Sequence, residues 1–197
     1  MLNKGRDAER RPDFTHDEYR SLTAHFAHWI EESRKGKSHD MRLLLRDYVL
    51  ILANTGMRPG TETENLLWQH VRVFRDKGKD YLEMTVNGKT GRRDIICRAN
   101  TVNYLKRIHE RCDDIKGMTF EALLKAKLDK PVFRLPDGTA SMNLRQTFKA
   151  YLTDIGLLQC PRTGLDRTLY SLRRRGQIRA SASAQFRTMR GWRSAST

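Results

Sequence analysis

The chain has 197 residues, enough for one sizeable core but crowded for two full domains. Its 38 Lys and Arg residues outnumber 23 Asp and Glu residues and give a formal net charge of +15, so DNA or RNA is the expected partner. Three widely spaced cysteines argue against a disulfide framework or a zinc ribbon, and no apolar run suits a membrane span or a signal peptide. We expect a cytoplasmic protein with no membrane, metal, cofactor or small-molecule substrate.

The sequence divides into three parts. Residues 1–13 are polar and predict a flexible lead-in, whereas residues 14–173 carry the periodic apolar pattern of a folded domain. Residues 174–197 contain six arginines and no acidic residue. Because this tail has few large apolar residues to bury, we expect it to be disordered on its own.

Two amphipathic helices open the domain. Thr15 and Glu18 stand at capping-box spacing, and the helical apolar period continues to about Arg34. Ser38 is the expected N-cap of a second helix, which ends near Gly56. Aromatic residues at helical spacing predict packing faces rather than base-stacking positions. They are Phe26, Trp29, Tyr48, Phe148 and Tyr151.

A small sheet is expected next, after a short helix over residues 61–67. Alternating apolar residues predict strands around Val73, Met84 and Ile95. Gly-containing turns separate them, the second over residues 87–91, so we expect a three-stranded antiparallel meander.

Helical spacing returns three times in the second half of the domain. It follows an expected Asn100 cap as far as Cys112, recurs weakly over residues 120–128, and is clear from Ser141 to Gly156. The predicted fold class is therefore α+β, mainly helical, with one small antiparallel sheet.

Three short motifs point to function. Residues 55–62 (TGMRPGTE) place the guanidinium of Arg58 where an apolar helix gives way to a Gly/Pro break, a position that can aim a planar donor fork at a phosphate. Residues 86–92 (VNGKTGR) set Lys89 on a turn, and residues 169–173 (LYSLR) end in an arginine. Taken singly, each basic residue would be a helix-end arginine, a solvated turn lysine or part of a basic run.

In this order the motifs resemble the first arginine box, the β-hairpin lysine and the second arginine box of the tyrosine recombinases, the phage-integrase family. The resemblance covers roughly residues 11–173 and implies the catalytic core of DNA breaking-rejoining enzymes, with double-stranded DNA and other recombinase protomers as partners. It implies that Arg58 and Arg173 grip the scissile phosphate and that Lys89 protonates the leaving 5′ oxygen. It also implies that Tyr170 takes the position usually held by histidine. The further expected DNA contacts are Arg92, Arg174 and Arg175.

The sequence departs from the family pattern in several respects. No tyrosine follows Tyr170, so these 197 residues lack the nucleophile that forms the family's covalent 3′-phosphotyrosyl link, and we expect no turnover. The acidic residue expected one turn after Arg58 falls at Glu62, with Thr61 in the nearer position. A phenol at position 170 also keeps its proton at neutral pH, unlike the family's imidazole.

The abrupt change of composition after Arg173 suggests that residues 174–197 are a foreign C-terminus produced by a truncation or a shifted reading frame. The family's N-terminal DNA-clamping domain has no counterpart before Phe14. Two functions remain open: a catalytic-domain fragment of a site-specific integrase, and a non-catalytic basic DNA-binding protein that interferes with a full-length recombinase.

Overall fold

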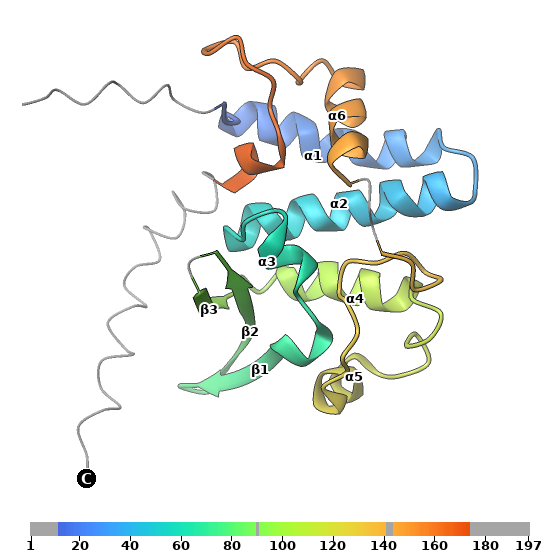
Figure 1. The fold of residues 1–197 in the computed structure, drawn as a ribbon, viewed down its shortest axis with the longest axis vertical. Coiled ribbons are helices and arrows are strands. Elements are labelled where there is room, and N and C mark those ends of the chain that lie inside the picture. The colour runs from blue at the N-terminus through green and yellow to red at the C-terminus, as the bar shows by residue number, and fades with distance from the viewer. Residues whose placement is uncertain (1–11, 90, 141–143, 174–197) are drawn as a thin grey trace, which may run out of the picture.

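The structure is a computed structural model that describes residues 12–89, 91–140 and 144–173. A helical layer is joined to a three-stranded sheet (Figure 1). The α-helices are α1 (His16–Glu31), α2 (Lys37–Thr55), α3 (Thr61–Glu64), α4 (Thr101–Arg111), α5 (Phe120–Ala126) and α6 (Leu144–Asp154). The strands are β1 (Val71–Asp76), β2 (Lys79–Gly88) and β3 (Gly91–Ile96), and the 3-10 turns are η1 (Trp68–His70) and η2 (Leu169–Leu172). The coarse prediction of a mixed, mainly helical α+β fold is confirmed.

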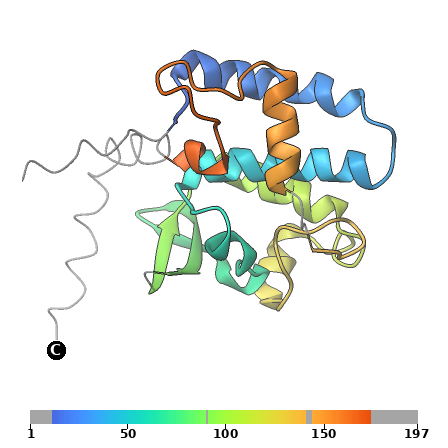
Figure 2. The same cartoon turned by 45° about the horizontal axis from the view of Figure 1, so that its top comes forward.

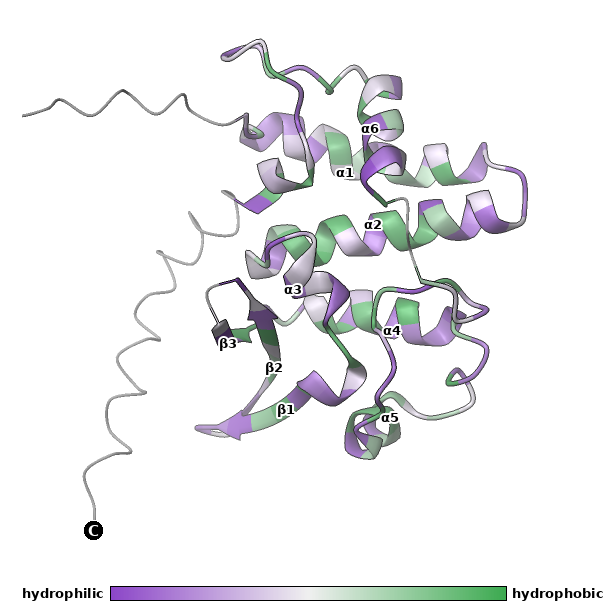
Figure 3. Cartoon of the chain, viewed as in Figure 1, coloured by the Kyte–Doolittle hydropathy of each residue, from purple (hydrophilic) through white to green (hydrophobic). Residues whose placement is uncertain are grey.

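Helix α2 lies at the centre of the helical layer. It contacts α1, α4, α6 and η2, and the two ribbon views agree on this arrangement (Figures 1 and 2). Such a helix must be apolar on more than one side, which explains the run of apolar residues from Tyr48 to Ala53. Hydrophobic residues alternate with hydrophilic ones along the surrounding helices (Figure 3). The core therefore forms around α2.

The first helix begins as its sequence predicts. The Glu18 amide donates to Thr15 Oγ1 at 3.2 Å, and the Thr15 amide donates to Glu18 Oε2 at 2.8 Å, which completes the capping box. Helix α1 ends at Glu31, a little before the expected Arg34. The five aromatic residues expected in the core are all buried, and the rings of Phe26 and Tyr151 stack at 4.3 Å.

The ends of α2 depend on glycine. The prediction of Ser38 as its N-cap is wrong, because α2 begins at Lys37 and Gly36 occupies the cap position with φ of 125°. A residue without Cβ tolerates this backbone, whereas serine caps from an extended conformation. At the other end Gly56, with φ of 67°, ends the helix as predicted. The chain then turns sharply into α3.

The predicted antiparallel meander is confirmed, with strand order β1-β2-β3. Val86 of β2 pairs with Arg93 of β3, and Gly88 pairs with Gly91, so Lys89 lies on the tight turn between these strands. Val86 and Ile95 are buried. The sheet thus directs one face at the helices and carries Lys89 at its end.

The remaining helices, α3 to α6, match their predictions in type but differ in where they begin or end. Asn100 occupies the cap position of α4 without capping it, and its side-chain amide donates instead to the Tyr104 hydroxyl at 2.9 Å. Helix α3 ends at Glu64, before the expected residue 67. Helix α5 follows a Thr119 cap. The expected start of α6 at Ser141 lies outside the described residues.

A buried arginine fastens the segment before η2. Arg167 is 3% exposed, and its guanidinium donates to the Glu18 carboxylate at 2.5 Å. The same group donates to three backbone carbonyls, those of Asp13, Leu157 and Gln159. Because every donor edge is directed into protein, this arginine acts as a structural staple between η2 and the start of α1.

Candidate functional site

The candidate site lies at the C-terminal end of α2. Figures 1 and 2 show η2 close to this end of the helix, and Figure 1 shows the β2–β3 hairpin close to it as well. The left-handed turn at Gly56 frees the chain from the helix, so that Arg58 follows in a half-buried position before α3. Three segments that are distant in the sequence therefore meet here.

Glu62 is the organising residue of the site. Its side chain is 1% exposed and receives hydrogen bonds from the Arg58 amide at 2.7 Å and from Arg58 Nη1 at 2.9 Å. Arg93 donates to the same carboxylate from Nη2 at 2.8 Å and from Nε at 3.2 Å. Both oxygens are thus occupied, and two guanidiniums are held in fixed positions by one buried acid.

The pKa of Glu62 reflects this arrangement. Burial alone would raise it, but the hydrogen bonds from Arg93 and from Arg58, together with their positive charges, outweigh burial and hold the pKa below the ordinary carboxyl value. Glu62 is therefore ionised at neutral pH, and it compensates one of the positive charges around it.

Close backbone packing brings the hairpin onto Glu62. A Cβ atom added to Gly88 would lie 2.9 Å from Glu62 Cγ and 3.0 Å from Glu62 Oε1. Only glycine allows this approach without displacing the carboxylate. Lys89, the next residue, is exposed on the turn and carries its ammonium group from the same end of the hairpin.

Arg173 approaches the site from η2. Burial, and then the charges of Arg58 and Arg93, lower the pKa of Arg173 below its usual value. Arg173 therefore lies close enough to Arg58 and Arg93 for their positive charges to act on its guanidinium. Arg173 Nε is buried without a hydrogen-bond partner in the described part of the chain. An unsatisfied donor of this kind at the edge of a cationic cluster suits an anionic acceptor.

Tyr170 lies beside Arg173. In a 3-10 turn, side chains three residues apart lie on the same side, so the Tyr170 ring and the Arg173 guanidinium leave η2 together. Tyr170 is 46% exposed. Its neighbour Tyr48 is buried and exchanges a hydrogen bond with Thr63 Oγ1 at 2.9 Å, and burial raises the pKa of Tyr48 to about 12.

The structure brings some of the expected site residues together and leaves others apart. Arg58, Arg173 and Tyr170 meet at the end of α2, and Lys89 lies on the adjoining turn. Arg92 is exposed and pairs with Asn87, so it occupies the opposite face of the hairpin from Val86 and Arg93. Arg174 and Arg175 lie outside the described residues, as does the tail over residues 174–197.

Arg93 is the site residue that the sequence analysis missed. Two adjacent arginines lie near the start of β3, and only one of them can share a face with the buried Ile95. The alternation of a strand points to Arg93, two residues before Ile95, and points away from Arg92. This alternation of buried and exposed positions is the feature of the sequence that identifies Arg93 as a site residue.

The cluster has a clear electrostatic character. Two guanidiniums (Arg58 and Arg93) bond to one carboxylate (Glu62) and a third (Arg173) lies near them, so the group carries an excess of two positive charges. Donor edges fixed before a ligand arrives bind phosphate without the cost of ordering long side chains. The arrangement can therefore hold one phosphodiester group, with an ammonium and a phenol nearby.

Two further observations concern metal ions and membranes. Within residues 12–89, 91–140 and 144–173, no group of three His, Cys, Asp or Glu residues is placed to hold a metal ion. Over the same ranges, none of the helices combines the length and the apolar character needed to cross a bilayer.

Comparisons with known proteins give a structural likeness but no match in sequence. No protein family matches the sequence, and no curated protein matches it. Among solved structures, the chain is similar to the FLP recombinase–Holliday junction complex I, with 14% sequence identity and a TM-score of 0.37. The similarity covers 69% of this chain and 40% of that chain, so the present chain spans less than half of the recombinase.

Proposed function

We propose that residues 14–173 form a tyrosine-recombinase type of catalytic domain that binds double-stranded DNA through a backbone phosphate. In this proposal Arg58, Arg93 and Arg173 grip the phosphate, and Lys89 stands near the oxygen that would leave. Residues 1–13 and 174–197 flank this domain.

The observation that supports the proposal most strongly is the convergence of two arginine boxes on one buried acid. Arg58 and Arg173 lie far apart in the sequence, yet both are neighbours of Glu62 and Arg93. The guanidinium of Arg167, which has a structural role, donates from all three of its nitrogens to protein acceptors. Arg173 Nε instead remains without a partner among the described residues. The net charge of +15 supports a polyanion as the ligand.

Strand cleavage would need a nucleophile as well as this grip. No tyrosine follows Tyr170 in the 197 residues, and Tyr170 occupies the position at which the family places an acid–base group. We therefore propose that this chain binds DNA without cutting it. Such a protein would compete with an active recombinase for its DNA, which is the second function left open by the sequence.

Binding can be tested with fluorescently labelled duplex DNA over a series of salt concentrations. Arg173→Gln should weaken binding by about tenfold, because a charge-assisted phosphate contact is lost, and should reduce the salt slope by about one. Arg145→Gln on the exposed side of α6 is the control with the same change of charge, and it should alter affinity by less than about twofold. Equal losses in the two variants would refute a specific phosphate site and leave only a generic polycation.

Cleavage is tested separately with a nicked duplex, which traps a covalent protein–DNA adduct. The adduct would migrate as a shifted band on a denaturing gel. We expect no such band from the 197-residue chain. A band that disappears in Tyr170→Phe would overturn the non-cleaving assignment while leaving the phosphate site intact.

A further inference from the structure

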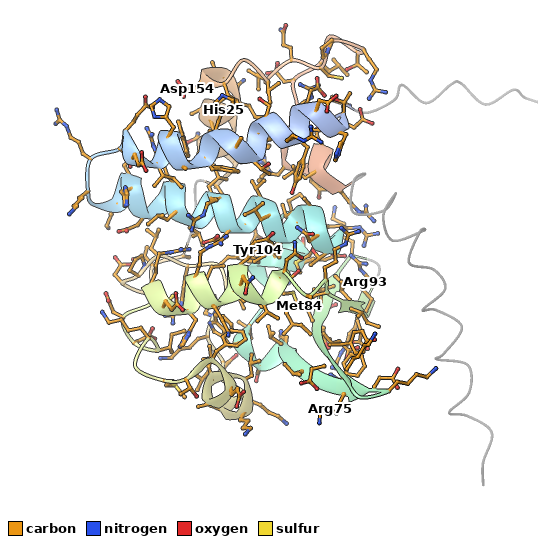
Figure 4. All side chains as sticks on the ribbon, turned by 180° about the vertical axis from the view of Figure 1, so that it is seen from behind. His25, Arg75, Met84, Arg93, Tyr104 and Asp154 are labelled. Atoms are coloured by element: carbon orange, nitrogen blue, oxygen red, sulfur yellow. The ribbon has the colours of Figure 1, made fainter. Side chains whose placement is uncertain are left out.

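A hollow of about 290 Å³ lies on the face formed by α1, α2 and α4. Figure 4 shows these three helices side by side, with Tyr104 labelled on α4 and Arg93 toward the hairpin. Tyr19 contributes from α1 and Asn54 from α2, and Arg98 comes from the segment after β3. With Asn100, the polar lining of the hollow thus includes two phenol rings, two amides and a guanidinium.

An arginine cluster continues this face along α2 and α4. Asp47 is fully buried at 0% exposure and accepts from Arg107 Nε at 2.7 Å and from Arg111 Nη2 at 2.6 Å. Arg46 adds a longer contact at 3.2 Å. The three arginine side chains keep between 20% and 36% exposure. Only the cations of this network therefore reach solvent, and they exceed the acid by two charges.

Helical spacing places the cluster and the hollow in one line. Arg46, Leu50 and Asn54 follow each other at intervals of four on α2, and hence share a face. On α4, Tyr104 and Arg107 lie three residues apart and also share a face, with the Arg107 guanidinium 5.0 Å from the centre of the Tyr104 ring. The line extends for about 12 Å along α2 and ends near the site, since Asn54 immediately precedes the turn that carries Arg58.

The chemistry of this line fits one class of ligand. A basic track with aromatic side chains along it is the pattern that binds single-stranded nucleic acid, in which cations follow the backbone and rings stack with bases. A duplex keeps its bases inside and is far too wide to enter a hollow of about 290 Å³. An unpaired strand can place a base there.

We propose that the α2/α4 face binds an unpaired segment of DNA, namely the part of the strand that continues from the phosphate held at the candidate site. This inference rests on the proposed function. The Asp47-held arginines contact its backbone, and the Tyr104 ring stacks with one of its bases. The protein then binds a frayed or branched DNA better than an intact duplex of the same sequence.

The test compares a blunt duplex with the same duplex bearing an overhang of about eight thymidines, with each strand polarity examined separately. The unaltered chain should bind at least one overhang about fivefold more tightly than the blunt duplex. Tyr104→Leu and Arg46→Gln should reduce that preference to below about twofold while leaving blunt-duplex affinity nearly unchanged. Arg46→Gln leaves Arg107 and Arg111 to satisfy Asp47, so it should fold even if the Tyr104 variant does not.

The outcomes separate the two proposals. Equal affinity of the unaltered chain for blunt and overhanging DNA would overturn this inference and leave the phosphate site standing. The inference would also be overturned if Arg46→Gln weakened binding to the blunt duplex and to the overhanging duplex by the same factor. Failure to bind any DNA would instead overturn the proposed function. Arg145→Gln serves again as the charge-matched control and should leave the preference for the overhang intact.

Discussion

Replacing Glu62 with glutamine should destabilise the fold and at the same time strengthen anion binding. The substitution keeps the size of the side chain but removes the charge that two guanidiniums share. It also turns an amide NH₂ toward N–H donors, because a glutamine oxygen can replace only one of the two carboxylate oxygens. The positive charges of Arg58, Arg93 and Arg173 would then repel one another with no negative charge to offset them.

The size of the effect follows from burial. Removing one partner of a buried ion pair costs about 3–5 kcal/mol. Arg58 and Arg93 keep 29% and 39% side-chain exposure, so water screens part of the loss. We therefore expect a decrease of about 2–4 kcal/mol in the free energy of unfolding, which corresponds to a fall of roughly 5–15 °C in Tm for a domain of this size.

The assay is urea unfolding followed by tryptophan fluorescence, with and without sulfate. Sulfate should stabilise Glu62→Gln more than the unaltered chain, because the variant cluster holds one more uncompensated charge. Asp80→Asn removes the same charge from an exposed pair with Arg75, and should cost no more than about 0.5 kcal/mol.

The pH dependence supplies a second check. The folded-state pKa of Glu62 is lowered, so its contribution to stability is complete above the ordinary value of 4.5 and is lost as the pH falls below it. The difference in unfolding free energy between the unaltered chain and Glu62→Gln should therefore become smaller as the pH falls below 4.5. A loss below about 0.5 kcal/mol at pH 7, or a gap that does not change with pH, would refute the role assigned to Glu62.

Three other changes give distinct outcomes. Hydrogen bonding from Arg134 lowers the pKa of Asp114 to about 2. Asp114→Asn should therefore remove a modest stability contribution that is present above pH 3.8 and is lost toward pH 2. Identical acid unfolding curves for the variant and the unaltered chain would contradict this. Arg167→Gln should cost about 3 kcal/mol or more and weaken DNA binding by loosening η2, as urea titration and anisotropy would show; unchanged stability would exclude the staple. Gly88→Ala should cost about 1–2 kcal/mol by displacing Glu62, whereas a neutral result would mean that the carboxylate can move aside.

The sequence predicts the elements of this fold well because their information is local. The capping box at Thr15, the glycine that ends α2 and the turn that carries Lys89 each depend on a few adjacent residues. The start of α2 was missed for a reason that is also local. Ser38 is a good cap by composition, but Gly36 supplies a backbone conformation that sequence periodicity does not reveal.

The candidate site could be predicted only in part, because its contacts are long-range. The motifs identify Arg58 and Arg173, yet nothing in either motif shows that Glu62 also holds an arginine from β3. Strand alternation could have favoured Arg93 over Arg92. Arg173 Nε is buried without a partner among the described residues, and Gly88 approaches Glu62 closely; neither feature follows from the sequence, since both depend on how separate elements pack.

The staple formed by Arg167 also bears on how the protein folds. Its bond to Glu18 joins residues 149 positions apart, and it fixes the segment that presents Arg173. Contacts of such high sequence separation carry a large loop-closure entropy and tend to form late. A chain still emerging from the ribosome would thus form its central helix long before the segment that presents Arg173 is fixed in place.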